Sequence, residues 1–407
     1  MATPQTPYDA VLHAARDVTR LDSALDAEML GAALLGSVYA VAEHDREQAV
    51  REFVTGFLAA TSRRRSAAAT TLRAVFAALV PDAEGAARVR PGAYAPSWAG
   101  QLGRVRVTGT WAYGDVYGDQ TSYLATFAYD EEEGGPEHAL VALVDHNIGI
   151  TKDVFVGGPA GRIVEQAREI CTEDEFTWFR TEDPARMHAE VSRHLAVTDD
   201  LTELPAQGSL ATDRALVGAR LAVLPGPTPA AGPAVVQPPT DEERTRLVRA
   251  FLDSPEANRF GLPEVADGEL ASLHFCLGLL LDHAASFPDA DPMRWSPMVA
   301  ELFLLDWVHR RAVLDMDDAA MLPRVLRAWA AYAARQRGLS QSAAARTDEA
   351  ITEMVPEFAR LYSTGERRSP ATAAVAQLMA DGVDPDDPEA LNAWIEANRH
   401  RLTDDPA

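Results

Sequence analysis

The feature that most constrains this chain is a proline-rich segment at residues 225–239. It holds six prolines and two glycines in fifteen residues, and proline interrupts both helices and sheet ladders because it lacks a backbone N–H. Such a segment tends to polyproline II and acts as a semi-rigid spacer. At roughly 100–200 residues per domain, a chain of 407 residues holds two to four domains. We therefore predict an interdomain linker over residues 225–239.

The region before the linker changes its hydrophobic period near residue 100. Val50, Phe53, Val54 and Phe57 follow the stripe of an amphipathic helix, and the spacing predicts a helical N-terminal segment over residues 1–99. A domain with a different architecture is expected from residue 100 to residue 224.

Residues 100–224 show the alternation of half-buried strands. Tyr123, Ala125, Phe127 and Tyr129 alternate with smaller or polar neighbours. With the apolar run at 139–144, the pattern predicts an antiparallel meander of about four strands, followed by helices. A short aromatic strand is expected at 176–179, with helices near 159–171, 184–195 and 213–224. The predicted fold class is α+β.

After the linker every segment is typical of a helix. Thr240 and Glu243 have the spacing of a capping box, and Ser296-Pro297 and Ser369-Pro370 each place a cap before a proline at the first helical position. Residues 240–407 are therefore expected to form an all-α bundle. Its helices should run near 240–253, 267–286, 296–314, 318–337, 341–362, 370–381 and 388–399.

Asp306 is an unusual residue within this bundle. It stands in the apolar run Leu302–Val308, where burial of a carboxylate would require a partner. Arg310 lies four residues further along the same helical face. We expect a structural ion pair between the two, and replacement of Asp306 with Ala should destabilise the bundle more than a surface change does.

The charge balance limits the classes of partner. There are 61 acidic and 37 basic residues, a net charge of −24. This argues against a nucleic-acid partner, because non-specific affinity comes from Lys and Arg neutralising phosphates; a protein partner is expected instead. No apolar stretch approaches the ~20 residues of a membrane span, and no signal peptide is visible. With only Cys171 and Cys276, the expected location is cytoplasmic.

The densest group of reactive side chains follows the most apolar strand. Asp145, His146, Asn147, Lys152 and Asp153 lie within nine residues, and Lys152 is the only lysine of the chain. Loops on a packed scaffold often carry function. In a catalytic arrangement His146 would be the general base, Asp145 or Asp153 would orient it, and Lys152 would hold an anion, with Asn147 as a binding group.

The alternative for this segment is an ordinary turn. Asp and Asn accept hydrogen bonds from nearby backbone groups, and Gly149 would supply a positive φ angle. The turn is the better interpretation of the two. Lys152 also has an explanation without function. Of the 37 basic residues 36 are Arg, and in a chain with this composition a single Lys can remain by chance.

Two further binding elements are weaker. A Tyr-Gly-Asp triplet occurs twice and ends at Asp115 and at Asp119, and these carboxylates could assist the Asp145–Asp153 segment. Arg162 follows a glycine-rich helix start, which could bind an anion. For both elements glycine turns and helix-start chemistry are the favoured reading. We find no motif for a metal or a cofactor, so none is expected.

Three stretches are similar to a known family: Trp111–Gln120, Leu143–Asp153, and Trp295–Pro297 with Phe303–Trp307. On these residues the chain resembles an uncharacterised protein family of high-GC actinobacteria. The resemblance would cover most of the chain from about residue 95, and it implies no activity.

Two functional hypotheses follow from the sequence. The first is a non-enzymatic interaction or regulatory protein, because catalytic signatures are absent and helical surface is abundant. The second is an enzyme, such as a hydrolase acting on an anionic small molecule, with its site around Asp145–Asp153.

Overall fold

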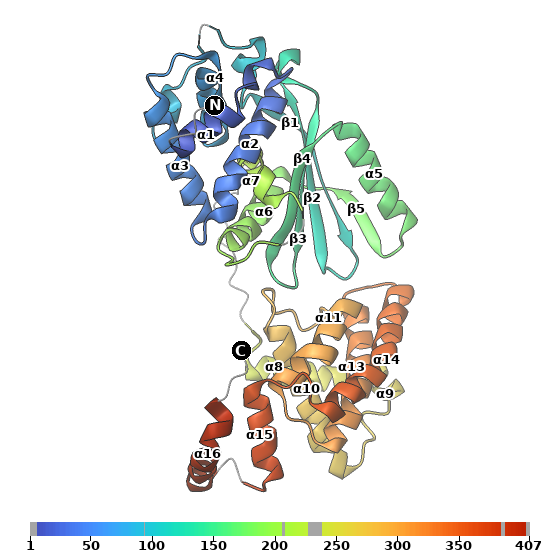
Figure 1. Ribbon diagram of the computed structural model, residues 1–407. Coiled ribbons are helices and arrows are strands. Elements are labelled where there is room, and N and C mark those ends of the chain that lie inside the picture. Colours follow the sequence, from blue (N-terminus) through green and yellow to red (C-terminus); the bar gives the residue numbers. More distant parts are fainter. Residues whose placement is uncertain (1–5, 93, 206–207, 227–237, 384–386, 404–407) are drawn as a thin grey trace. The chain divides into compact units, whose positions relative to one another are not determined.

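An antiparallel five-stranded sheet with helices on both sides forms the middle of the chain, so the predicted α+β class is confirmed (Figure 1). The structure is a computed structural model that describes residues 6–92, 94–205, 208–226, 238–383 and 387–403. It divides into two compact units. Unit 1 comprises Met1–Asp115 and Gln120–Ala234, and unit 2 comprises Val116–Asp119 and Val235–Ala407. Most of the expected linker, residues 227–237, lies outside the described residues.

The sheet of unit 1 has the strand order β4-β3-β2-β1-β5. The first four strands form the predicted meander, and the short aromatic segment adds a fifth strand that pairs antiparallel with β1, Phe179 opposite Tyr113. Each pairing in the sheet is antiparallel. The strands are β1 (Val105–Asp115), β2 (Gln120–Tyr129), β3 (His138–Asp145), β4 (Ile150–Gly157) and β5 (Thr177–Thr181).

The alternation along β2 sets the two faces of the sheet. Tyr123, Ala125 and Phe127 are buried in the main core of unit 1, whereas Leu124 faces a small second cluster. Period-2 side chains point to opposite faces of a strand. One face of the sheet is therefore buried under many helices and the other under a single helix.

The described residues of unit 1 form seven α-helices. Figure 1 shows α2, α6 and α7 on one side of the sheet and α5 on the other. The N-terminal helices share one core with the sheet, since Phe57 and Phe76 belong to the same cluster as Phe127. The helices are α1 (Pro7–Ala14), α2 (Ala24–Val41), α3 (Arg46–Thr61), α4 (Ala67–Leu79), α5 (Ala160–Glu173), α6 (Pro184–Asp199) and α7 (Leu210–Leu221).

Helix α2 corrects one expectation about membranes. It is 18 residues long with a mean hydropathy of 1.4, and by length and composition alone it could cross a membrane. Half of it is buried inside unit 1, and its Glu28 pairs with Arg220 of α7. These contacts are those of a core helix and fit a soluble protein.

From residue 238 onward the described elements are helical. The Thr240–Glu243 capping box is present as predicted, and so are the Ser296 and Ser369 caps. The α-helices are α8 (Asp241–Leu252), α9 (Pro255–Arg259), α10 (Leu270–Ala285), α11 (Pro297–Glu301), α12 (Val308–Arg311), α13 (Met316–Gln336), α14 (Gln341–Thr364), α15 (Pro370–Ala380) and α16 (Pro388–Thr403).

The segment around Asp306 differs from the expected regular helix. Leu302–Trp307 forms a π-helix between α11 and α12. Arg310 Nε lies 2.9 Å from the Asp306 carboxylate, so the predicted pair exists, but the two side chains are 57% and 36% exposed. Arg367 also contacts Asp306, at 3.1 Å. The expectation of a buried carboxylate is wrong.

Candidate functional site

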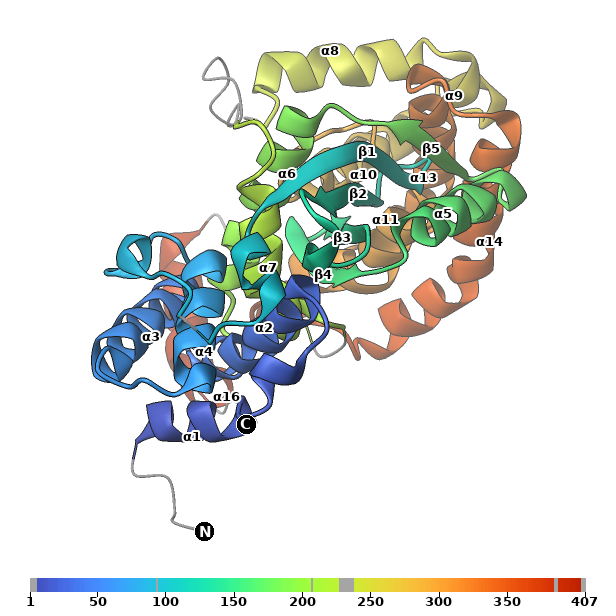
Figure 2. The same ribbon diagram turned by 90° about the horizontal axis from the view of Figure 1, so that it is seen from above.

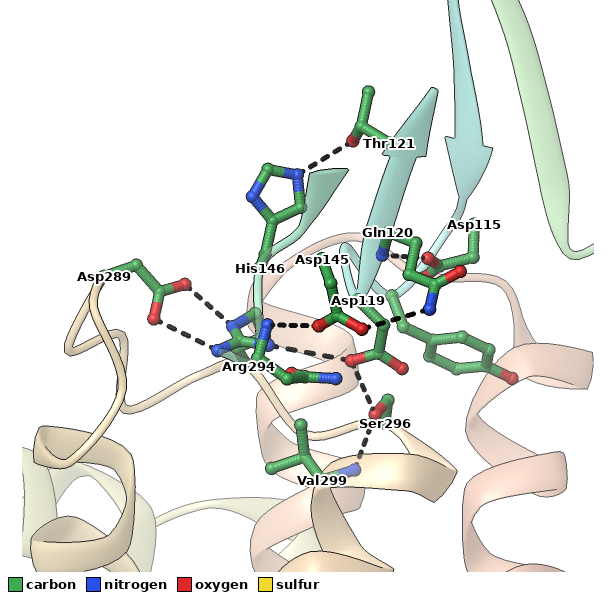
Figure 3. Close-up of polar contacts among 12 residues, drawn as sticks. Asp115, Asp119, Gln120, Thr121, Asp145, His146, Asp289, Arg294, Ser296 and Val299 are labelled. Carbon is green, nitrogen blue, oxygen red and sulfur yellow. Dashed lines mark hydrogen bonds and ion pairs between the residues drawn. The ribbon is translucent and has the colours of Figure 1, made fainter. Parts of the chain in front are cut away.

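Asp145 ends strand β3 and accepts hydrogen bonds from strand β2 and from the following turn. Gln120 Nε2 donates to its carboxylate at 3.2 Å, and the backbone N–H of Asn147 donates to it at 3.0 Å (Figure 3). Lys152 Nζ lies 3.6 Å away. Gly149 has a φ of 72°. The bond from Asn147 and the positive φ of Gly149 are features of a turn.

His146 packs toward β2 and α6. Its Nε2 lies 3.0 Å from the Thr121 hydroxyl (Figure 3), and its ring centroid is 5.6 Å from that of His194, edge to face. His194 is buried, which lowers its pKa. The His146 ring thus lies against a hydroxyl and a second imidazole.

Asp153 accepts a hydrogen bond from the residue that precedes helix α7. Its Oδ1 accepts the backbone N–H groups of Val154 at 2.8 Å and of Ser209 at 2.7 Å. The neighbouring Lys152 side chain is 49% exposed. Of the four residues predicted as catalytic, the structure brings Asp145 and Lys152 within ion-pair distance.

The two Tyr-Gly-Asp carboxylates belong to different units. In unit 1, Asp115 accepts the backbone N–H of Gln120 at 2.7 Å. In unit 2, Asp119 accepts a hydrogen bond from the Ser296 hydroxyl at 2.9 Å and lies 3.6 Å from Arg294 Nη1 (Figure 3). Arg162 is exposed on the first turn of α5.

A groove of about 780 Å³, which the sequence did not predict, runs between α5 and the neighbouring face of the sheet. Thr108 and Trp111 of β1 and Thr126 of β2 line it on the sheet side, and the Thr108 and Thr126 hydroxyls lie 2.7 Å apart. On the other side lie residues of α5 with Glu137. We call this feature the α5 groove; its further lining residues are Ala160, Gly161, Val164, Glu165, Arg168, Glu169, Thr172 and Glu173.

Gly109 leaves room for the Trp111 indole, which forms the aromatic part of the α5 groove. A Cβ atom at this position would lie 2.2 Å from Cη2 of Trp111, so the indole rests directly on the glycine backbone. The strand is irregular here, with a register shift between Val107 and Gly109. A half-buried indole is thereby presented to the groove.

The charge of the α5 groove is predominantly negative. Glu137, Glu165, Glu169 and Glu173 are exposed lining residues. Among the residues that the structure describes, none of these four side chains has an ion-pair or hydrogen-bond partner. The one lining cation, Arg168, stacks 5.3 Å above the Phe179 ring. The groove thus combines unpaired carboxylates with an aromatic surface.

Comparison of the chain with protein-family models, with curated proteins and with solved structures gives no match. Within the described ranges, no group of three or more His, Cys, Asp or Glu side chains is placed to hold a metal ion.

Proposed function

We propose that this chain is a non-enzymatic interaction protein that binds a basic segment of a partner protein in the α5 groove. The observation that carries the proposal is the set of four unpaired glutamates beside Trp111. The net charge of −24 also supports a basic partner, because it attracts such a partner at long range.

The composition of the groove favours arginine over other cations. A guanidinium stacks on an indole face and donates hydrogen bonds to carboxylates at the same time. Thr108 and Thr126 add hydroxyl groups for polar backbone atoms of an extended segment. The proposed ligand is therefore an arginine-containing peptide segment.

The proposed location is the cytoplasm. Cys171 and Cys276 are both free thiols, and reduced cysteines are typical of a reducing compartment. An interaction protein of this kind needs neither a metal nor a cofactor, and the proposal includes neither.

The test is a titration of the full-length chain into a fluorescent peptide in which arginine alternates with glycine. We expect saturable binding that weakens as salt rises, since exposed charges are screened. The double variant Glu165→Arg/Glu169→Arg should weaken binding about tenfold or more, because each reversal replaces an attraction with a repulsion.

The double variant Glu84→Arg/Glu203→Arg is the matched control, since both glutamates are exposed on unit 1 and neither lines the groove. It changes the net charge in the same way, so binding that falls equally in this variant would contradict the site. Equal binding of a peptide with glutamine in place of arginine would contradict the ligand class.

A further inference from the structure

A second cavity, independent of the α5 groove, lies between the N-terminal helices of unit 1 and helix α7. It has a volume of about 240 Å³, and Figure 2 shows α2, α3, α4 and α7 side by side. Its walls are mainly aliphatic. They include Leu35, Val50, Leu79, Val80, Ala211 and Ala215.

The cavity exists because α7 comes close to α2 and, apart from Arg214, presents small side chains there. A Cβ atom on Gly36 of α2 would lie 2.5 Å from the carbonyl oxygen of Ala211, so the glycine permits the close approach. Ala211, Ala215 and Ala219 follow one another at four-residue intervals on the lining face of α7. None of these methyl groups is long enough to fill the space.

Two arginines stand beside this apolar space, each already held by an aspartate. Arg51 Nε lies 2.6 Å from the Asp82 carboxylate. Arg214 Nη2 lies 2.6 Å from Asp199, and the Arg214 side chain is only 13% exposed. Each guanidinium group beside the cavity therefore has an aspartate partner.

Glu47 places a carboxylate between the two guanidinium groups without bonding to either. Its Oε1 is 3.8 Å from Arg51 and its Oε2 is 3.8 Å from Arg214. These distances exceed that of a hydrogen bond, and the Glu47 side chain is 64% exposed. A carboxylate position is therefore provided next to the cavity, and its present occupant is loosely held.

We propose that this cavity binds a small monocarboxylate with an apolar body. The ligand carboxylate takes the position of Glu47 between Arg51 and Arg214, and Glu47 turns into solvent. The body fills the aliphatic space. An apolar cavity of about 150 Å³ holds benzene, so the larger volume here fits an aromatic ring with a short chain.

The test uses isothermal titration calorimetry of the full-length chain with 3-phenylpropanoate as the probe and 3-phenylpropanamide as its uncharged analogue. We expect the acid to bind more tightly than the amide. Glu47→Gln should tighten binding of the acid by about threefold or more, because it removes the competing charge while its loose contacts cost little.

Filling the cavity provides the second arm. Ala215→Leu and Ala219→Leu each place a larger side chain in the space and should abolish binding, with thermal unfolding measured to confirm that the variants fold. Ala60→Leu, on an exposed position of α3 outside the cavity, should bind as the parent does. The proposal is overturned if neither the parent nor Glu47→Gln binds the acid. It is equally overturned if the filled variants bind normally or if the amide binds as tightly as the acid.

Discussion

Glu28 of α2 and Arg220 of α7 form an ion pair inside unit 1 in which each side chain is only 1% exposed. The Tyr129 hydroxyl donates to the Glu28 carboxylate at 2.7 Å and accepts from Arg220 at 2.9 Å. Arg220 Nε donates to Nε2 of His138 at 2.8 Å. One hydrogen-bonded network thus connects the N-terminal helices, the sheet and α7.

Replacing Arg220 with Met should destabilise unit 1 strongly. The substitution leaves Glu28 buried without its cation, at a cost of roughly 3–5 kcal/mol. Thermal unfolding of the full-length chain measures the loss. The double variant Glu28→Gln/Arg220→Met should recover part of it, since neither charge remains. A single variant that melts like the parent would contradict the network.

The same network makes stability depend on pH. Burial, with the neighbouring Arg220, lowers the pKa of His138 to about 4, whereas an unfolded histidine titrates near pH 6.5. Between these values the unfolded chain binds more protons, so the free energy of unfolding falls as the pH falls. The loss attributable to His138 is about 3 kcal/mol.

His138→Gln tests this dependence because glutamine can still accept from Arg220 but does not titrate. The fall in melting temperature between pH 7 and pH 4.5 should be smaller than in the parent. His13→Gln, at an exposed position, should leave the fall unchanged. A His138→Gln profile that parallels the parent's would refute the assignment.

The strands were predictable because their pattern is local. The alternation from Tyr123 to Tyr129 is enough to place one face in a core, and the pairing of successive strands follows from the short connections. Helix caps such as Asp183 and Thr240 are equally local signals. The partial exposure of Asp306 was not predictable, because the apolar run around it does not show which of its residues face the core.

Asp306→Ala should therefore have a small effect. Both of its arginine partners are about half exposed, and exposed ion pairs contribute about 0–1 kcal/mol. Urea unfolding of the full-length chain should show a midpoint close to that of the parent. A loss of several kcal/mol would mean that the carboxylate is desolvated in solution.

The α5 groove could not be predicted because its residues come from distant parts of the sequence. Glu137 precedes β3, whereas Glu165, Glu169 and Glu173 lie on α5. Only the packing of α5 across the sheet brings them together with Trp111. By contrast, the polar residues of Asp145–Asp153 are close together in the sequence itself. Such a local group of polar residues is equally typical of an ordinary turn.

The enzyme hypothesis places the functional site at that turn instead of in the α5 groove. If Lys152 and His146 form no ligand site, Lys152→Arg and His146→Ala should leave binding of the arginine peptide unchanged. Because Lys152 is half exposed, Lys152→Arg should also melt within about 1 °C of the parent, as expected for an exposed ion pair. Loss of peptide binding in either variant, without loss of stability, would move the site to Asp145–Asp153.

The central claim is that a basic segment binds in the α5 groove. Hydrogen–deuterium exchange of the full-length chain, with and without the arginine–glycine peptide, tests it most directly. We predict that peptide slows exchange in Ala160–Glu173 and in Val105–Asp115, and leaves the helices of unit 2 unchanged. Protection confined to unit 2 or to the Asp145–Asp153 segment, with none in α5, would contradict the account.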